Sequence, residues 1–237
     1  KVLLTGHVDE IGMVVKSIDE KGYVRPHQLG TLFAHSLGAQ EVTLTTREGK
    51  KLKGIIGTHS KSPSFQLNKD VIPVQDLIID IGVYSKQELV DLGVRIGDPI
   101  TPNGYYQVLN NPDFISAKAW DDRVGASLVC EAAMNVKDID TEAAIYFGGT
   151  VQEEVGCRGA KTVGQMVEPD ISIAIDVYPC NDTSNDAPSD FKLGEGFGIG
   201  LMDTMSIGHT GLVKYVEDIC AKHNIPFQET LITRGGT

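Results

Sequence analysis

The stretch Ile-Ser-Ile-Ala-Ile-Asp-Val, residues 171–177, decides the fold class of this chain. An almost continuous apolar run of this length is typical of a strand that is buried on both faces of a parallel sheet. The run ends in an acid, and Asp176 is difficult to explain as an ordinary surface residue at the end of a buried strand. The stretch therefore predicts a parallel sheet with a polar site at the carboxyl ends of its strands.

The segments around this stretch alternate between strand and helix patterns. Residues 143–151 are rich in small and β-branched side chains and predict a strand, as does the apolar run 2–4. Residues 121–136 predict a helix, because apolar side chains recur there at four-residue spacing, and residues 212–222 predict a second amphipathic helix. This alternation predicts an α/β fold, in which a mainly parallel sheet is sandwiched by helices.

The middle of the chain follows a different pattern. Residues 41–46 alternate with period two, turn at 47–50 and return through 52–56, which predicts a β-hairpin. We therefore expect a small β-rich domain over residues 28–110, inserted between two parts of the α/β domain, 1–27 and 111–237. Residues 1–5 open directly in a strand-like run and 235–237 stop where a loop should begin, so we expect the α/β domain to be truncated at both ends.

Composition excludes several classes of protein. The 237 residues include 21 Lys and Arg against 32 Asp and Glu, a net charge of −11, which argues against nucleic-acid or anionic-membrane partners. No apolar run reaches the ~18–20 residues that a membrane span needs. The four cysteines form no CxxC pair and are too sparse for a disulfide scaffold, so we expect a cytoplasmic protein.

Acidic residues and one histidine follow the ends of the predicted strands. In chain order they are His7, Asp9, Asp121, Asp122, Glu153, Glu154 and Asp176. Because the carboxyl ends of parallel strands meet at one edge of a sheet, we expect these side chains to converge.

Crowded carboxylates repel one another and are costly to desolvate, and divalent cations remove that cost. Imidazole together with carboxylates suits Zn, Co or Mn. Two-metal sites hold their ions ~3.5–4 Å apart and activate a water between them. The neighbours Glu153 and Glu154 can divide two tasks, one binding a metal and the other moving protons.

Each residue taken alone also has a structural interpretation. Asp121 can be the N-cap of a helix, and Asp122 with Arg123 can be a surface ion pair. His7 can be a buried histidine that is bonded to a backbone carbonyl. The combination of residues, rather than any one of them, indicates a metal site.

Five stretches carry a family resemblance. They are 6–12 (Gly-His-Val-Asp-Glu-Ile-Gly), 119–125 (Ala-Trp-Asp-Asp-Arg-Val-Gly), 151–160 (beginning Val-Gln-Glu-Glu-Val-Gly), 174–177 (Ala-Ile-Asp-Val) and 235–237 (Gly-Gly-Thr). In order and spacing they resemble the glutamyl or deblocking aminopeptidases, dinuclear metallopeptidases that build tetrahedral particles and include members named endoglucanases. The resemblance implies a phosphorylase/hydrolase-like peptidase fold, an inserted domain that mediates dimerisation, and assembly of dimers into a homododecamer.

The resemblance also implies a set of metal ligands. It places His7 and Asp176 on one ion, Asp121 on both ions and Glu154 on the second. Zn and Co are the ions expected. The family takes a further histidine from a segment downstream of the Gly-Gly-Thr motif, so we expect the natural protein to continue beyond Thr237 and to have a helical stretch before Lys1.

The same resemblance implies the reaction. Glu153 acts as general base and then as general acid, while Asp9 orients His7. The expected activity is removal of the N-terminal residue of peptides. A related metal-dependent carboxypeptidase or deacylase is the first alternative; a glycosidase, which needs two carboxyls ~5–9.5 Å apart and no metal, and a non-catalytic assembly subunit are weaker ones. No basic cluster predicts a preference for acidic N-terminal residues, Arg234 being the only candidate near the motif.

Overall fold

The computed structural model describes residues 1–58, 72–180, 191–233 and 235–237, so Arg234 lies outside the described residues. The chain divides into two compact units, which are described separately. The α/β unit comprises Lys1–His7, Asp122–Glu153 and Gly159–Thr237. The barrel unit comprises Val8–Asp121 and Glu154–Arg158.

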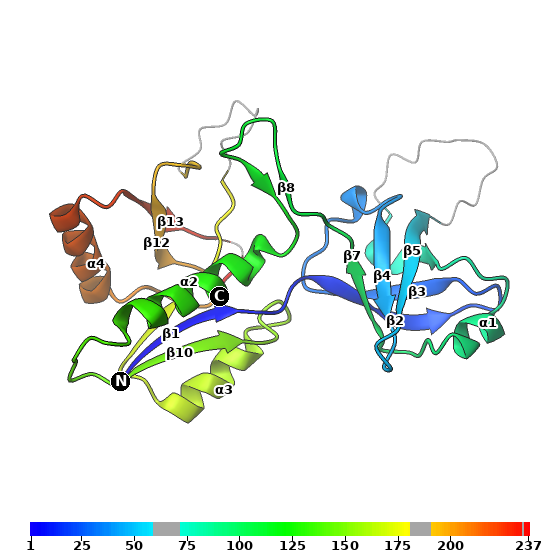
Figure 1. Cartoon of the computed structure of the whole chain (residues 1–237), viewed down its shortest axis with the longest axis horizontal. Coiled ribbons are helices and arrows are strands. Elements are labelled where there is room, and N and C mark those ends of the chain that lie inside the picture. Colours follow the sequence, from blue (N-terminus) through cyan, green and yellow to red (C-terminus); the bar gives the residue numbers. More distant parts are fainter. Residues whose placement is uncertain (59–71, 181–190, 234) are drawn as a thin grey trace. The chain divides into compact units, whose positions relative to one another are not determined.

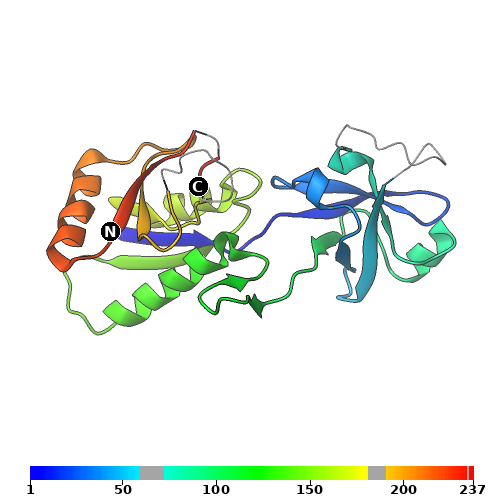
Figure 2. The same cartoon turned by 90° about the horizontal axis from the view of Figure 1, so that it is seen from above.

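The α/β unit is built on parallel strands. A three-stranded parallel sheet has the order β10-β1-β11, formed by Ile145–Thr150, Val2–His7 and Ile171–Ala174. A second parallel pair joins β12 (Phe197–Met202) to β13 (Phe227–Leu231). The helices are α2 (Trp120–Val136), α3 (Arg158–Val167) and α4 (Thr210–His223). Figures 1 and 2 show β1 and β10 running between α2 and α3, which confirms the expected parallel sheet among helices.

The register of the sheet brings the three strand ends to one edge. His7 pairs with Thr150 of β10, and Thr5 pairs with Ala174 of β11. Residues that follow each strand by two or three positions therefore emerge side by side. Asp176 lies two residues beyond Ala174, the end of β11, and His7 lies two residues beyond Thr5, the partner of Ala174. The two residues therefore occupy corresponding positions along neighbouring strands.

Two glycines let helix α2 approach this sheet closely. A Cβ at Gly6 of β1 would lie 2.6 Å from the backbone nitrogen of Ala126. A Cβ at Gly125 of α2 would lie 2.6 Å from the carbonyl oxygen of Ile175. Real Cβ atoms do not come this close to backbone, so both contacts require glycine. They hold the N-terminal turns of α2 against the ends of β1 and β11.

The barrel unit confirms the expected β-rich module as a closed antiparallel barrel of six strands in the order β2-β3-β6-β5-β4-β7. Its strands are β2 (Gly12–Ile18), β3 (Val24–Leu29), β4 (Glu41–Thr45), β5 (Lys51–Thr58), β6 (Leu77–Asp80) and β7 (Pro99–Pro102). Inward-facing apolar side chains fill it, among them Met13, Val24, Leu44, Ile79 and Ile100. The short elements η1 (Ala34–Ser36), η2 (Val74–Asp76), α1 (Lys86–Asp91), β8 (Gln107–Val108) and β9 (Ile115–Ser116) complete the unit.

The barrel begins earlier in the chain than residue 28, where the sequence pattern placed its start. Strand β2 pairs with β7 as well as with β3, so the barrel closes only when Gly12–Ile18 and Val24–Leu29 belong to it. The sequence pattern assigned this region to the α/β domain because it follows β1 directly. Pairing between β2 and β7 joins residues far apart in the chain, which local periodicity cannot detect.

Helix α1 begins with a variant of a capping box, formed by Ser85 and Glu88. The hydroxyl of Ser85 accepts the N–H of Glu88 at 3.3 Å. The carboxylate of Glu88 accepts the N–H of Tyr84 at 3.0 Å, one residue before the cap.

Among the described residues, no helix combines the length and the apolar character needed to cross a membrane.

Candidate metal centre

His7 is the last residue of β1, and its imidazole lies between two acids that follow the neighbouring strands. Its side chain is 1% exposed, and its Nε2 is 3.8 Å from Oδ1 of Asp176 and 3.8 Å from Oε2 of Glu153. Those two carboxylates are mostly buried, with 21% and 13% of their side chains exposed. At 3.8 Å neither pair is a hydrogen bond, so the three groups are neighbours around a common space.

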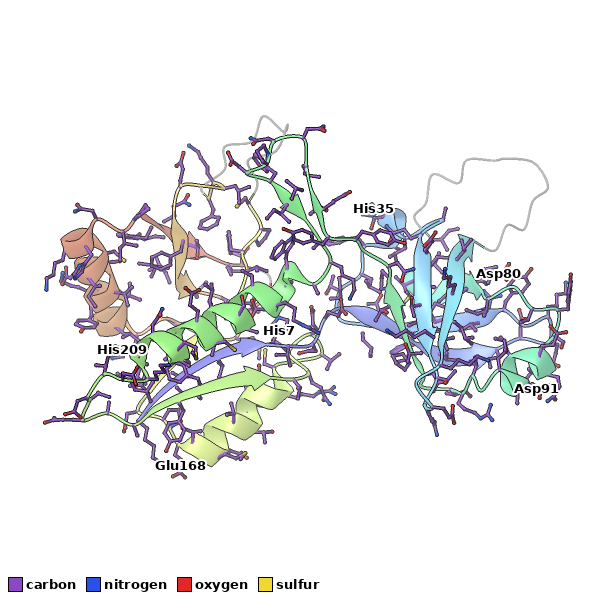
Figure 3. The ribbon with its side chains drawn as sticks, in the orientation of Figure 1. His7, His35, Asp80, Asp91, Glu168 and His209 are labelled. Atoms are coloured by element: carbon purple, nitrogen blue, oxygen red, sulfur yellow. The ribbon has the colours of Figure 1, made fainter. Side chains whose placement is uncertain are left out.

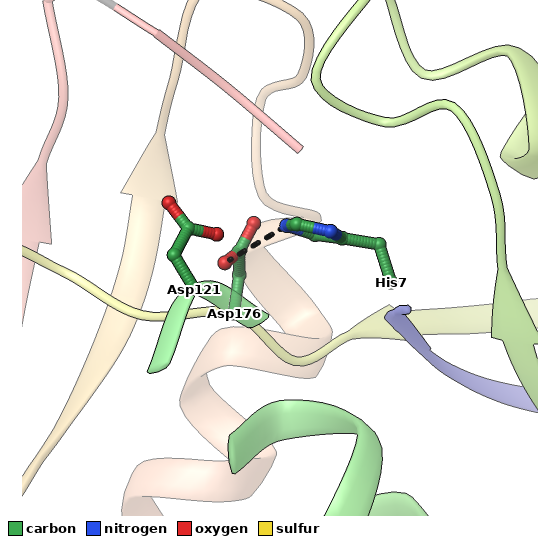
Figure 4. A group of neighbouring side chains, drawn as sticks. All are labelled: His7, Asp121 and Asp176. Atoms are coloured by element: carbon green, nitrogen blue, oxygen red, sulfur yellow. Dashed lines mark ion pairs between the residues drawn. The ribbon is translucent and has the colours of Figure 1, made fainter. Parts of the chain in front are cut away.

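Asp121 joins His7 and Asp176 in one group. It stands in the first turn of α2, the helix that Gly125 holds against the sheet. One ligand atom from each of these three side chains lies within 4.8 Å of the other two (Figure 4). One imidazole and two carboxylates form a donor set that suits Zn or Co, so these residues fit a divalent metal ion.

His209 of the α/β unit has another role, because its Nδ1 accepts the N–H of Leu212 and caps α4 (Figure 3).

Asp122 is a buried neighbour of this group and accepts two backbone hydrogen bonds. The residue is 0% exposed; its Oδ2 accepts the N–H of His7 at 3.0 Å, and its Oδ1 accepts the N–H of Gly125 at 3.0 Å. Burial, followed by the negative charge of Asp176, raises the pKa of Asp122 to about 6, although these two hydrogen bonds oppose the rise. The interpretation of Asp122 as half of a surface ion pair is therefore wrong.

The charge of this region also fits a cation. Three acids surround His7: Asp176 and Glu153 lie near its imidazole, and Asp122 accepts its backbone N–H. The raised pKa of Asp122 shows that the protein groups around it do not fully offset the cost of its charge. A bound divalent cation would lower that cost for every carboxylate nearby.

The segments that carry the site residues contain unusual backbone conformations. Ala119, next to the start of α2, has φ 58°, and Gln152, next to Glu153, has φ 57°. Non-glycine residues adopt positive φ uncommonly, and they persist in it only where the surrounding structure enforces it. The loop with Gln152 is closed by a bond from the N–H of Gly159 to the carbonyl of Val151 at 2.9 Å. Such outliers cluster at functional sites.

Asp9 and Glu154 contact each other in the barrel unit. The Oδ2 of Asp9 accepts the backbone N–H of Glu154 at 3.3 Å. Asp9 thus holds the segment that carries Glu154. The expected orientation of His7 by Asp9, and the assignment of individual ligands to two ions, remain predictions.

Sequence reasoning named Asp122 as a candidate but did not predict its buried supporting role, and it missed the close contacts that Gly6 and Gly125 allow. The spacing of Asp122 and Gly125, three residues apart at a helix start, was the available signal for the local hydrogen bond. Nothing in the local sequence indicates the bond from His7, because its partner lies 115 residues away.

Comparisons with known proteins agree with this geometry. The model of the M42 glutamyl aminopeptidase family matches residues 1–237. A glutamyl aminopeptidase of Lactococcus lactis subsp. cremoris is 31% identical over 241 residues, covering 100% of this chain and 66% of that protein.

Solved structures give the same result. A TET aminopeptidase from a Thaumarchaeota archaeon has a TM-score of 0.91 and 34% identity, covering 100% of this chain and 67% of its own. The TET1 peptidase of Pyrococcus horikoshii has a TM-score of 0.88 and 34% identity, covering 100% and 70%, and can assemble into a tetrahedron or a large octahedral shell. A structure from Thermotoga maritima described as an endoglucanase, 23% identical with a TM-score of 0.73 over 98% of this chain and 71% of its own, shares the fold. The chain spans about two thirds of the length of these proteins.

Proposed function

The chain belongs to the M42 glutamyl aminopeptidase family of metalloaminopeptidases, and on that premise we propose that it removes the N-terminal residue of peptides with Glu153 as general base. The observation that carries the proposal is the convergence of His7, Asp176 and Glu153 at the ends of three adjacent parallel strands. These strands bring together in one site residues that are separated by more than half of the chain.

The chain's own side chains supply the ligands. His7 and Asp176 would hold one ion, Asp121 would contact both, and Glu154 would hold the second, with Zn or Co as the metal. Bound there, two divalent cations would lower the pKa of a water and polarise the carbonyl of the scissile bond. Asp122 keeps His7 in place through the backbone N–H bond, and Asp9 would orient its imidazole.

Glu153 moves the proton in this proposal. Its carboxylate lies 3.8 Å from Nε2 of His7 and is largely shielded from solvent. It takes a proton from the attacking water as that oxygen bonds to the scissile carbonyl carbon. It then gives the proton to the departing amine nitrogen as the C–N bond breaks, so Glu153 is regenerated.

The test uses the complete protein with a panel of aminoacyl reporter substrates, several added metals and a chelator. We expect turnover that the chelator abolishes and added Zn or Co restores. Glu153→Gln should keep its metal and its fold and lose turnover ~10²–10⁴-fold, the range for a general base. Glu142→Gln, at an exposed acid before β10, is the matched control and should be unchanged.

Other outcomes contradict the proposal in distinct ways. Chelator-insensitive release of sugar would favour the glycosidase, and release of C-terminal residues or acyl groups would favour the carboxypeptidase or deacylase. A purified protein without bound metal would favour the assembly subunit. Substantial turnover by Glu153→Gln would remove Glu153 from its role.

We further propose a homo-oligomer, a dodecamer assembled from dimers, in which the inserted β-rich domain mediates dimerisation. The assemblies of the Pyrococcus horikoshii relative support this proposal. Light scattering on the complete protein and on a variant without the inserted domain would test this proposal. A wild-type protein that is monomeric would contradict it. Peptides are the proposed partners, and the cytoplasm is the proposed location on the basis of the sparse cysteines.

A further inference from the structure

Gly30, directly after β3, lies against the side chain of Glu154. A Cβ at this position would be 2.9 Å from Oε2 of Glu154, 3.2 Å from its Cβ and 2.7 Å from Cγ2 of Ile11. The backbone of Gly30 also has φ +73°, a conformation that favours glycine. Gly30 therefore meets two separate requirements, one from its own backbone and one from the space that Glu154 fills.

The segment before β2 also contacts residues at this site. Asp9 accepts the backbone N–H of Glu154, and Ile11 packs at the same point as Gly30. Between them, Glu10 pairs with Lys118 at 2.5 Å. The backbone of Glu154 is thus held by Asp9, and its side chain lies against Gly30, all within the barrel unit.

We infer that Gly30 is a positioning residue for the carboxylate of Glu154, so that the end of barrel strand β3 sets where this proposed metal ligand lies. The inference rests on the proposed function, because it takes Glu154 as a ligand. It assigns the end of β3 a part in holding this ligand, in addition to the part in assembly that is proposed for the inserted domain.

The distances around Gly30 show that an added Cβ would disturb the side chain of Glu154. A contact at 2.9 Å with a carboxylate oxygen and another at 2.7 Å with a methyl group cannot both be kept when a Cβ is added. The nearest atoms belong to the side chains of Ile11 and Glu154, so these side chains must shift by several tenths of an ångström. Metal–ligand distances tolerate only about ±0.2 Å, so a shift of that size is enough to weaken binding.

The experiment compares Gly30→Ala with Gly82→Ala in the complete protein. Gly82 is in the same unit and has φ +78°, but a Cβ there would meet nothing within 4 Å. Both glycines have a similar positive φ, so an alanine is strained at either position, and only the alanine at position 30 pushes on Glu154. The readouts are metal content per chain at controlled free Zn, the thermal unfolding midpoint, and kcat separated from KM.

We expect Gly30→Ala to weaken binding of the second ion ~10–100-fold, the range for residues that support metal ligands, and to leave the first ion bound. Gly82→Ala should bind both ions like the wild type. In a Glu154→Ala background, Gly30→Ala should cause no further loss of metal. Ile11→Ala combined with Gly30→Ala removes the methyl contact, which keeps the test available if the single variant does not fold.

Two failures are distinguishable. If the wild type binds two ions and Glu154→Ala loses one, but Gly30→Ala titrates like Gly82→Ala, the inference is overturned and the proposed function stands. If the wild type binds no second ion, or Glu154→Ala retains it, the ligand assignment itself is wrong.

Discussion

The two units of this chain differ in what they bury. In the barrel unit the fully buried side chains are mainly apolar, such as Leu44, Ile56 and Ile79. In the α/β unit several of the buried residues that the structure describes are polar; they are Thr5, His7, Asp122, Thr150 and Thr230. The barrel interior is mainly packed apolar side chains, with Thr46 and Asp98 as buried polar residues, whereas the α/β unit buries a larger share of polar groups among the described residues.

This difference shows how stability and function are divided. Burying an ionisable group costs free energy unless hydrogen bonds or charges compensate, and the raised pKa of Asp122 shows that the compensation is partial. Sites that depart from the rules of good packing are expected to be functional. The following predictions test whether the two interiors respond differently to substitution, to metal and to pH.

The largest expected effect on stability is in the barrel. Ile79→Ala removes a side chain that is 0% exposed and should lower the free energy of unfolding by about 2–5 kcal/mol, because it leaves a cavity in a closed core. Urea denaturation measures this change. Ile96→Ala, at a position 64% exposed, is the control and should stay within about 0.5 kcal/mol of wild type. A small effect of Ile79→Ala would contradict the picture of a tightly packed barrel.

Bound metal should stabilise the α/β unit more than the barrel unit. At a free Zn concentration one hundred times the Kd, binding should stabilise the folded protein by about 2.7 kcal/mol. Hydrogen exchange should show the added protection in β1 and the start of α2 rather than in the core strands of the barrel. His7→Ala should remove most of this stabilisation. Equal protection of both units would show that they do not respond separately.

Gly125→Ala tests the close approach of α2 to the sheet. An alanine normally stabilises a helix relative to glycine by up to about 1 kcal/mol. Here the added Cβ would clash with the carbonyl of Ile175, so the expected result is a destabilisation of about 1–3 kcal/mol.

Gly164→Ala in α3 is the matched control, since a Cβ there would meet nothing within 4 Å, and it should stabilise the protein by about 0.5–1 kcal/mol. Thermal unfolding of both variants measures whether each substitution stabilises or destabilises the protein. If both stabilise, α2 does not need glycine at position 125.

The smallest effect is a pH dependence at Asp203. Burial alone would raise the pKa of Asp203, but backbone N–H groups of Met205, Ser206 and Thr237 outweigh it and hold the pKa below its usual value. A lowered pKa contributes stability above pH ~4, and this contribution is lost as the pH falls through the folded-state value. Asp203→Asn should therefore destabilise the protein by at most about 1 kcal/mol at pH 7, with a difference that shrinks toward pH 3. A constant difference would contradict a role for the charge.

Much of the local structure could be predicted from the pattern of residues. The expected helix 121–136 is α2, Trp120–Val136, and the expected strand 143–151 contains β10, Ile145–Thr150. The expected strand 171–177 is shorter in the structure, because β11 ends at Ala174. That earlier end places Asp176 beyond the strand, beside His7.

Other features depend on contacts that no local pattern contains. The barrel closes through pairing of Met13 in β2 with Ile100 in β7, and this moved the start of the barrel upstream of the expected boundary. The burial of Asp122 follows from its bond with His7, and the contact of Gly30 with Glu154 likewise joins distant segments.

The sequence by itself determined which elements form and which chemical groups stand at their ends, because helix and strand periods come from backbone hydrogen bonds between near neighbours. It also placed an imidazole at the end of one strand and carboxylates after two others. Only the tertiary structure decided which of these groups touch and which are buried. Those outcomes depend on how closely distant segments pack, and in this molecule that closeness is set by single glycines at positions 6, 30 and 125.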